Sequence, residues 1–144
     1  MRIKVREIDN SLVFIGKGES NHWVVMDGPE KFKGENAGTR PLELMLISLA
    51  GCTAADVASI LNKMKVSYHR FWIEAEASRK TEHPKVFKSI HLKYYFVKLP
   101  GISVDEDKLK KAIELSQDKY CSASAMLRQV AELTYSYELI EYDG

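Results

Sequence analysis

Short apolar runs alternate with charged and turn-forming residues over the first forty positions of the chain. Residues 3–8 and 11–17 alternate apolar and polar side chains on either side of an Asp-Asn pair, so they predict a β-hairpin. Residues 22–27 predict a third strand. Residues 28–39 contain three glycines, one proline and one asparagine, a composition typical of a loop. The chain is therefore expected to begin with a strand meander and a long loop.

The next segment is a long apolar run that predicts one helix. Proline is favoured at the first helical position, where its missing N–H costs nothing, so we expect the helix to run from Pro41 to about Lys63. Its apolar residues surround the helix axis, which indicates burial on most sides and favours a second subunit. These residues are Leu42, Leu44, Met45, Leu46, Ile47, Leu49, Val57, Ile60 and Leu61.

The remainder of the chain predicts a second group of strands and two helices. Residues 67–80 and 86–99 alternate apolar and polar side chains, a pattern that predicts two long strands. Helices are expected at 104–119 and about 121–132, and residues 134–142 predict a last strand. This order of elements predicts an α+β fold in which antiparallel sheets wrap around long helices. The length suits a single domain spanning 1–144.

Charge and N-terminal composition exclude several classes of partner. Lys and Arg number 21, Asp and Glu number 20, and the two signs are mixed along the chain, so we expect no nucleic-acid partner. The N-terminus lacks the apolar stretch of a signal peptide, which predicts a cytoplasmic protein. Thiols are kept reduced in that compartment. A cysteine pair there is more often catalytic, redox-sensing or metal-binding than structural.

The central apolar run is long enough to suggest a transmembrane helix. Polar side chains interrupt it, which favours a buried helix and no membrane partner. They are Glu43, Ser48, Thr53, Asp56 and Ser59.

The chain has two cysteines, each expected in a helix. Cys52 lies within the apolar run and is either a small core residue or a reactive thiol. The preceding Gly51 indicates close approach by a partner helix or a substrate, because glycine costs about 1 kcal/mol relative to alanine inside a helix. Cys121 lies where a helix is expected to begin, so unpaired N–H groups and the helix dipole are expected to lower the pKa of its thiol.

Three other residues near the first helix are candidates for a site. Glu43 lies in the first turn, where a carboxylate is also favoured by the dipole and by capping, and roughly 13 Å of helical rise separates it from Cys52. Arg40 is held extended by the following proline and can fold back over the helix start. Asp56 is expected to be a buried anchor or a substrate contact and not a catalytic residue, because a like charge raises the pKa of a thiol.

No metal or other resident cofactor is expected. The four histidines lie in different elements, and neither Cys-x-x-Cys nor His-x-x-x-His spacing occurs. No glycine-rich phosphate loop follows a predicted strand.

The segments "TRPLELMLISLAGCTAADVASIL" and "KYCSASAMLRQV" resemble the OsmC/Ohr family of osmotically induced and organic-hydroperoxide-resistance proteins, in particular its OsmC-like branch. The likeness extends over essentially the whole chain and lies in the order and spacing of the elements. It implies an intertwined homodimer in which two antiparallel sheets enclose two long central helices.

The resemblance also implies a chemistry. Characterised members are cysteine-based peroxidases, so Cys52 would be the peroxidatic cysteine and Cys121 the resolving one, with an external dithiol as reductant. Glu43 and an arginine would complete the site, although Glu43 lies one position later than the glutamate of many members. The strand meander offers Lys17 and His22 but no arginine at the expected place, which leaves Arg40 as the nearby guanidinium.

The first hypothesis is therefore a homodimeric thiol peroxidase of organic hydroperoxides that forms a Cys52 sulfenic acid and then a Cys52–Cys121 disulfide. The alternative is a redox-sensing or apolar-ligand-binding protein on the same scaffold with little peroxidase activity. Activation of Cys52 requires a cation, because burial alone raises the pKa of a thiol.

Overall fold

The computed structural model describes residues 1–143 and shows two compact units, Met1–Leu46 and Ile47–Gly144. The long helix α1, Pro41–Lys63, begins in the first unit and continues into the second. The single domain expected over residues 1–144 would have to include both units, and it stays a prediction.

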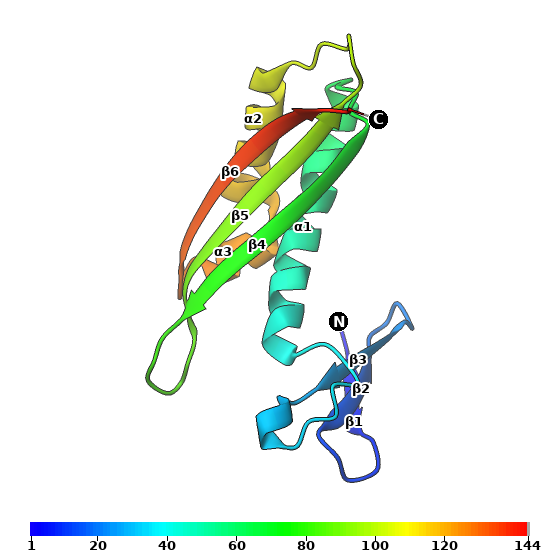
Figure 1. Ribbon diagram of the computed structural model, residues 1–144, viewed down its shortest axis with the longest axis vertical. Helices are drawn as coiled ribbons and strands as arrows, with labels where there is room; N and C mark the ends of the chain where they lie inside the picture. The colour runs from blue at the N-terminus through cyan, green and yellow to red at the C-terminus, as the bar shows by residue number, and fades with distance from the viewer. Residues whose placement is uncertain (144) are drawn as a thin grey trace. The chain divides into compact units, whose positions relative to one another are not determined.

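The first unit contains the predicted strand meander. Strands β1 (Lys4–Glu7), β2 (Val13–Lys17) and β3 (Trp23–Asp27) form an antiparallel sheet in that order (Figure 1). The Asp-Asn pair of the first turn adopts positive φ angles of 50° and 54°, a conformation that these two residue types tolerate. The hairpin and the third strand are confirmed, and the following loop contains one short 3₁₀ helix, η1 (Glu30–Phe32).

The buried carboxylate of Asp27 organises that loop. Its Oδ2 atom accepts hydrogen bonds from the backbone N–H groups of Glu35 at 2.8 Å and Ala37 at 2.9 Å. The hydrogen bond from Ala37 lowers the pKa of Asp27, and those from Glu35 and Gly28 and the charge of Arg40 act in the same direction. The longest irregular segment of the chain is thus ordered around one ionised side chain.

Helix α1 has the predicted bounds but a different burial. One face is buried, at Leu49, Thr53, Val57 and Leu61. Met45 and Ile47 keep 45% and 56% of their surface exposed, so a single chain does not bury the helix on most sides, and its burial by a second subunit stays a prediction. By length and composition the helix is also apolar enough to cross a membrane, a property that core helices of soluble proteins share.

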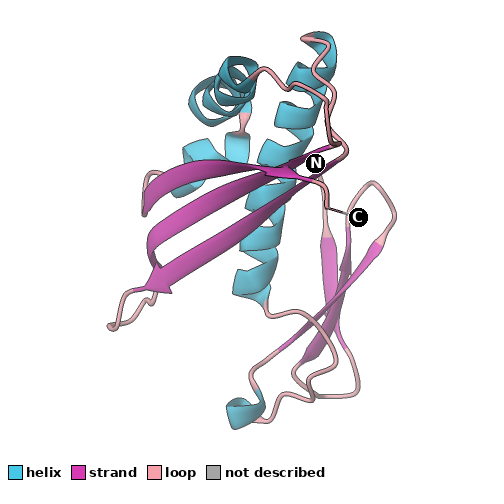
Figure 2. Cartoon of the chain, turned by 45° about the horizontal axis from the view of Figure 1, so that its top comes forward, coloured by secondary structure: helices cyan, strands magenta, loops and turns pink. Residues whose placement is uncertain are grey.

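The second unit contains a three-stranded sheet with helices on one face (Figures 1 and 2). Its strands are β4 (Arg70–Arg79), β5 (Phe87–Lys98) and β6 (Glu132–Glu141). The helical elements that join β5 to β6 are α2 (Glu106–Leu115), the π-helical turn η2 (Ser116–Tyr120) and α3 (Ser122–Leu127).

The α+β class is confirmed, with one difference in strand pairing. β4 and β5 pair antiparallel as predicted, whereas β5 and β6 pair parallel. The prediction of purely antiparallel sheets is wrong for this pair because the helical connection crosses over one face of the sheet and returns the chain in the same direction. The last helix is shorter than predicted, which allows β6 to begin at Glu132.

The core of the second unit forms between the sheet and its helices. Ile90, Leu92, Tyr94 and Phe96 of β5 alternate inward and have exposed fractions of 1% or less. They face the buried stripe of α1 and the inner side of α2. The apolar residues that α2 contributes are Leu109, Ala112 and Ile113.

Candidate functional site

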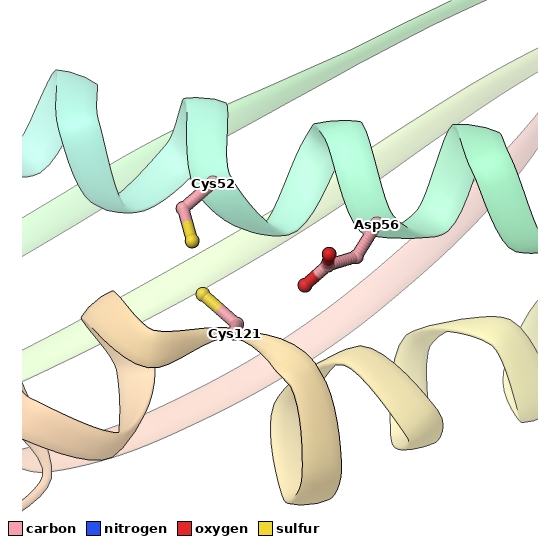
Figure 3. A group of neighbouring side chains, drawn as sticks. All are labelled: Cys52, Asp56 and Cys121. Carbon is pink, nitrogen blue, oxygen red and sulfur yellow. The ribbon is translucent and has the colours of Figure 1, made fainter.

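The second unit brings Cys52 and Cys121 together although they are far apart in the sequence. Cys52 projects from the middle of α1, and Cys121 lies between η2 and α3 (Figure 3). Their sulfur atoms and a carboxylate oxygen of Asp56 all lie within 4.8 Å of one another. Both cysteines are free thiols. The structure therefore contains a reduced cysteine pair with an acidic neighbour.

A π-helical turn sets the position of Cys121. The backbone N–H of Cys121 donates to the carbonyl of Ser116 at 2.8 Å and closes this wider turn, and single π-turns occur frequently at functional sites. Cys121 is also the N-cap of α3, because its sulfur accepts a hydrogen bond from the N–H of Ser124 at 3.4 Å. The prediction that a helix begins beside this thiol is confirmed.

The prediction of a lowered pKa for Cys121 is wrong for the net shift, although the N–H group at the helix start acts in the predicted direction. Burial raises the pKa of this thiol above its ordinary value. The hydrogen bond from the backbone N–H of Ser124 acts in the opposite direction, and the neighbouring Cys52 adds to the increase. Desolvation outweighs the cap here because only 2% of the Cys121 surface is exposed.

A chain of buried hydrogen bonds ends on the carboxylate of Asp56. The hydroxyl of Ser116 donates to Asp56 Oδ2 at 3.0 Å, since a carboxylate can only accept. Because the Ser116 proton is used there, Thr53 is the donor in its 2.8 Å bond to Ser116. Tyr94 is then the donor in its 2.7 Å bond to Thr53. Every hydroxyl in this chain is therefore oriented toward Asp56.

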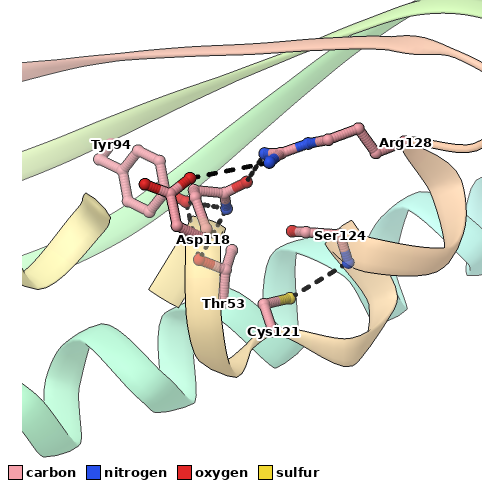
Figure 4. A network of polar contacts seen from close by, with 7 residues as sticks. Thr53, Tyr94, Asp118, Cys121, Ser124 and Arg128 are labelled. Atoms are coloured by element: carbon pink, nitrogen blue, oxygen red, sulfur yellow. Dashed lines mark hydrogen bonds and ion pairs between the residues drawn. The ribbon is translucent and has the colours of Figure 1, made fainter. Parts of the chain in front are cut away.

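Gln117 and Arg128 extend the chain at its other end. Figure 4 shows Thr53, Tyr94 and Arg128 of this network. The amide nitrogen of Gln117 donates to Tyr94 at 2.8 Å and to Thr53 at 3.1 Å, and its oxygen accepts from Arg128 at 3.2 Å. Burial raises the pKa of Tyr94 to about 12, so the phenol stays protonated at neutral pH. The network runs from a guanidinium to a carboxylate, an arrangement in which successive hydrogen bonds polarise one another.

A cavity of about 390 Å³ adjoins the cysteine pair through Asp56. Its walls come from the C-terminal end of α1 and from α2 and η2. They combine apolar groups with one lysine and one carboxylate. The lining residues are Asp56, Ser59, Ile60, Lys63, Met64, Leu115 and Tyr120.

Glu43 and Arg40 contact each other in the first unit. The Oε2 atom of Glu43 accepts a hydrogen bond from the backbone N–H of Arg40 at 3.1 Å, a contact that caps the start of α1. The charge of Arg40 contributes to the lowered pKa of Asp27. The capping interpretation of Glu43 is therefore realised, and the catalytic roles of both residues stay predictions.

Other cationic residues of the chain lie in different surroundings. Lys17 donates to Asn21 at 2.7 Å and lies over the ring of Trp23, and His22 is exposed. Arg128 contacts Gln117, with Asp118 at 3.7 Å.

Sequence reasoning excluded Asp56 from catalysis, left it as a buried anchor or a substrate contact, and did not identify the buried network. One signal was available for Asp56, because residues four apart on a helix lie on the same face, and Asp56 follows Cys52 at that spacing. Thr53, Ser116 and Gln117 carried no comparable signal, since their contacts join segments that are distant in sequence.

Comparison with known proteins places the chain among a group of similar sequences and folds. A family model described as OsmC-like protein matches residues 34–136. Protein YhfA of Escherichia coli strain K12 is 32% identical over 140 residues, which cover 97% of this chain and 98% of YhfA.

Solved structures show the same architecture. A hypothetical protein from Aquifex aeolicus VF5 has a TM-score of 0.81 and 28% identity, with 99% of this chain and 97% of that chain covered. The organic hydroperoxide resistance protein OhrB of Bacillus subtilis has a TM-score of 0.65 and 14% identity, with 96% and 98% covered. At that identity, the likeness to OhrB concerns the fold alone.

Proposed function

Because the chain belongs to the OsmC-like protein family, we propose that it is a thiol-dependent peroxidase that reduces organic hydroperoxides. The observation that carries this proposal is the pair of free thiols, whose sulfur atoms lie within 4.8 Å of each other. A disulfide requires the sulfurs to approach to about 2.05 Å, and the side chains already point toward one another (Figure 3). The proposal includes the cytoplasm as the site of action.

The reaction uses both cysteines and an external dithiol. The thiolate of Cys52 attacks the terminal oxygen of the hydroperoxide, so the O–O bond breaks, an alcohol leaves after taking up a proton, and Cys52 becomes a sulfenic acid. The thiolate of Cys121 then attacks the Cys52 sulfur, and hydroxide leaves as water after protonation. The disulfide is reduced by a dithiol through a mixed disulfide, which regenerates two thiols.

The cavity beside Asp56 is the proposed binding site for the organic part of the substrate. Ile60, Met64 and Leu115 supply apolar surface, which favours an alkyl or aryl hydroperoxide over hydrogen peroxide. Replacing Met64 with glutamine is expected to raise the KM for cumene hydroperoxide more than it lowers kcat.

The functional unit is proposed to be a homodimer. Apolar side chains of α1, Met45 and Ile47, and of the first sheet, Trp23, Val24 and Val25, are exposed in the single chain. A second copy would cover such surfaces. In this dimer, Arg40 is proposed as the cation that stabilises the Cys52 thiolate of the other copy, with Glu43 as its carboxylate partner.

Peroxide consumption by the reduced, metal-free protein tests the function. With cumene hydroperoxide and dithiothreitol, we expect turnover by the wild type, none by Cys52→Ser, and for Cys121→Ser a single oxidation followed by slow recycling. Ser122→Ala, at an exposed position beside Cys121, is the matched control and should behave as the wild type. A wild type no faster than Cys52→Ser would contradict the proposal.

A second candidate function is redox sensing by the same pair. The observation that favours it is burial of Cys121, which raises the pKa of its thiol and slows disulfide closure at neutral pH. Stoichiometric oxidation by peroxide without turnover in the assay above would select this alternative.

A further inference from the structure

We propose that the reduced side chains of Cys52, Asp56 and Cys121 form a binding site for a thiophilic divalent metal ion such as Zn²⁺. Two sulfur atoms and one carboxylate oxygen converge within 4.8 Å (Figure 3). In a tetrahedral zinc site with Zn–S near 2.3 Å and Zn–O near 2.1 Å, neighbouring ligand atoms lie roughly 3.5–3.8 Å apart. Small side-chain rotations are enough to close the observed group around an ion.

The ligand types select the class of metal. Thiolates favour zinc and other soft or borderline ions, whereas magnesium and calcium prefer sites made only of oxygen ligands. Two thiolates and a carboxylate provide three negative charges for the cation, and metal binding drives the loss of the thiol protons. The burial of Cys121 opposes a free thiolate, but it does not oppose a thiolate neutralised by a metal.

The surroundings of Asp56 fit a metal ligand. Its Oδ2 atom is held by the Ser116 hydroxyl at 3.0 Å, and Ser116 is itself held by Thr53 at 2.8 Å. Hydrogen bonds of this kind orient ligand side chains in metal sites, and their loss typically costs about 10–100-fold in affinity. Asp56 also lines the cavity of about 390 Å³. That cavity reaches the site at Asp56 and is the proposed entry path for the ion.

Metal binding and disulfide formation are mutually exclusive because they use the same sulfur atoms. When a hydroperoxide oxidises the metal-bound pair, two electrons pass from the thiolates to the peroxide and the S–S bond forms as the O–O bond breaks. Two protons from water complete the alcohol and water products, and the ion is released as Zn²⁺. The site requires only reduced cysteines, so it does not rest on catalytic turnover.

Two measurements on the full-length, reduced protein test the site. Titration with Zn²⁺ against a chromogenic chelator gives affinity and stoichiometry, and substitution with Co²⁺ gives thiolate-to-metal charge-transfer absorption. We expect one ion per chain with that absorption in the wild type, and its loss in Cys52→Ser and Cys121→Ser. Asp56→Asn should bind Zn²⁺ at least about 10-fold more weakly and Ser116→Ala about 10–100-fold more weakly.

Glu114→Gln is the matched control, because this exposed carboxylate lies 3.8 Å from Lys111 on the surface of α2. It should bind zinc as the wild type does, and circular dichroism establishes that each variant is folded. Absence of charge-transfer absorption in the reduced wild type, or equal zinc affinity in folded Asp56→Asn, overturns the three-residue site. Peroxidase assays on metal-free protein are scored separately, so zinc binding without turnover rejects only the proposed function.

Discussion

The two units of this chain have similar strand patterns but very different interiors. In the second unit, β5 presents a row of fully buried side chains to α1 and α2, and a polar network is enclosed beside them. In the first unit, the described residues bury Val13, Gly16 and Asp27, while Trp23, Val24 and Val25 of β3 are exposed. Alternation of apolar and polar residues thus produced strands in both units, but a core in only one.

This difference shows where stability and chemistry reside. A three-stranded sheet needs a packed hydrophobic face to be independently stable, and β3 has such a face without a cover in the single chain. The second unit contains its own core together with the two thiols. The first unit is therefore the part that depends most on the proposed partner subunit.

Deleting core volume in the second unit is expected to have the largest effect. Leu92→Ala removes a fully buried side chain and should lower the free energy of unfolding by about 2–5 kcal/mol. Val25→Ala in the first unit, where 41% of the side chain is exposed, should cost well under half as much in a monomer. Urea denaturation at low protein concentration measures both. Equal losses would contradict the contrast between the units.

Breaking the buried network is expected to have the next largest effect. Thr53→Val keeps the shape of the side chain but leaves the hydroxyls of Tyr94 and Ser116 without their Thr53 partner. We expect a loss of about 1–3 kcal/mol in unfolding free energy, because unsatisfied buried polar groups are costly. Thr81→Val, at an exposed position, is the control and should be near neutral. A neutral Thr53→Val would mean that the network contributes little.

Acid should weaken the first unit through its buried carboxylate, Asp27. The hydrogen bond from Ala37, aided by that from Glu35, holds the pKa of Asp27 below its ordinary value of about 3.9. Its stabilising contribution is present above that ordinary value and is lost as pH falls through the lowered pKa. Trp23 lies in the first unit and Trp72 in the second, so Trp72→Phe leaves a fluorophore that reports on the first unit alone.

In this background Asp27→Asn should be less stable at neutral pH and should lack the part of the acid response that Asp27 contributes. If Asp27→Asn leaves the acid transition of Trp23 fluorescence unchanged, titration of other groups causes that transition.

The smallest expected effect concerns Gly51 of α1. A Cβ atom added there meets nothing within 4 Å in the single chain, so Gly51→Ala should stabilise the monomer by up to about 1 kcal/mol through helix propensity. If the proposed partner packs on this face, the added methyl should also weaken the dimer. Sedimentation equilibrium measures the dissociation constant, and unchanged dimerisation would place the interface elsewhere.

Much of the fold followed from local patterns. Pro41 and the apolar run after it predicted the bounds of α1, and alternation over residues 86–99 predicted the strand β5. The resemblance to the OsmC/Ohr family is confirmed by the family match. The parallel pairing of β5 with β6 was missed, because strand direction depends on the path of the connecting helices and not on the pattern within either strand.

The features of the candidate site also divide into those that local sequence patterns predict and those that tertiary structure decides. The sequence by itself determined that two thiols lie at defined points of helical segments and that Glu43 lies where it can cap α1, because capping and helix periodicity act over three or four residues. Only the tertiary structure decided that Cys52, Asp56 and Cys121 meet and that burial raises the pKa of Cys121. Contact and desolvation depend on packing between segments distant in the chain, a property that local patterns do not encode.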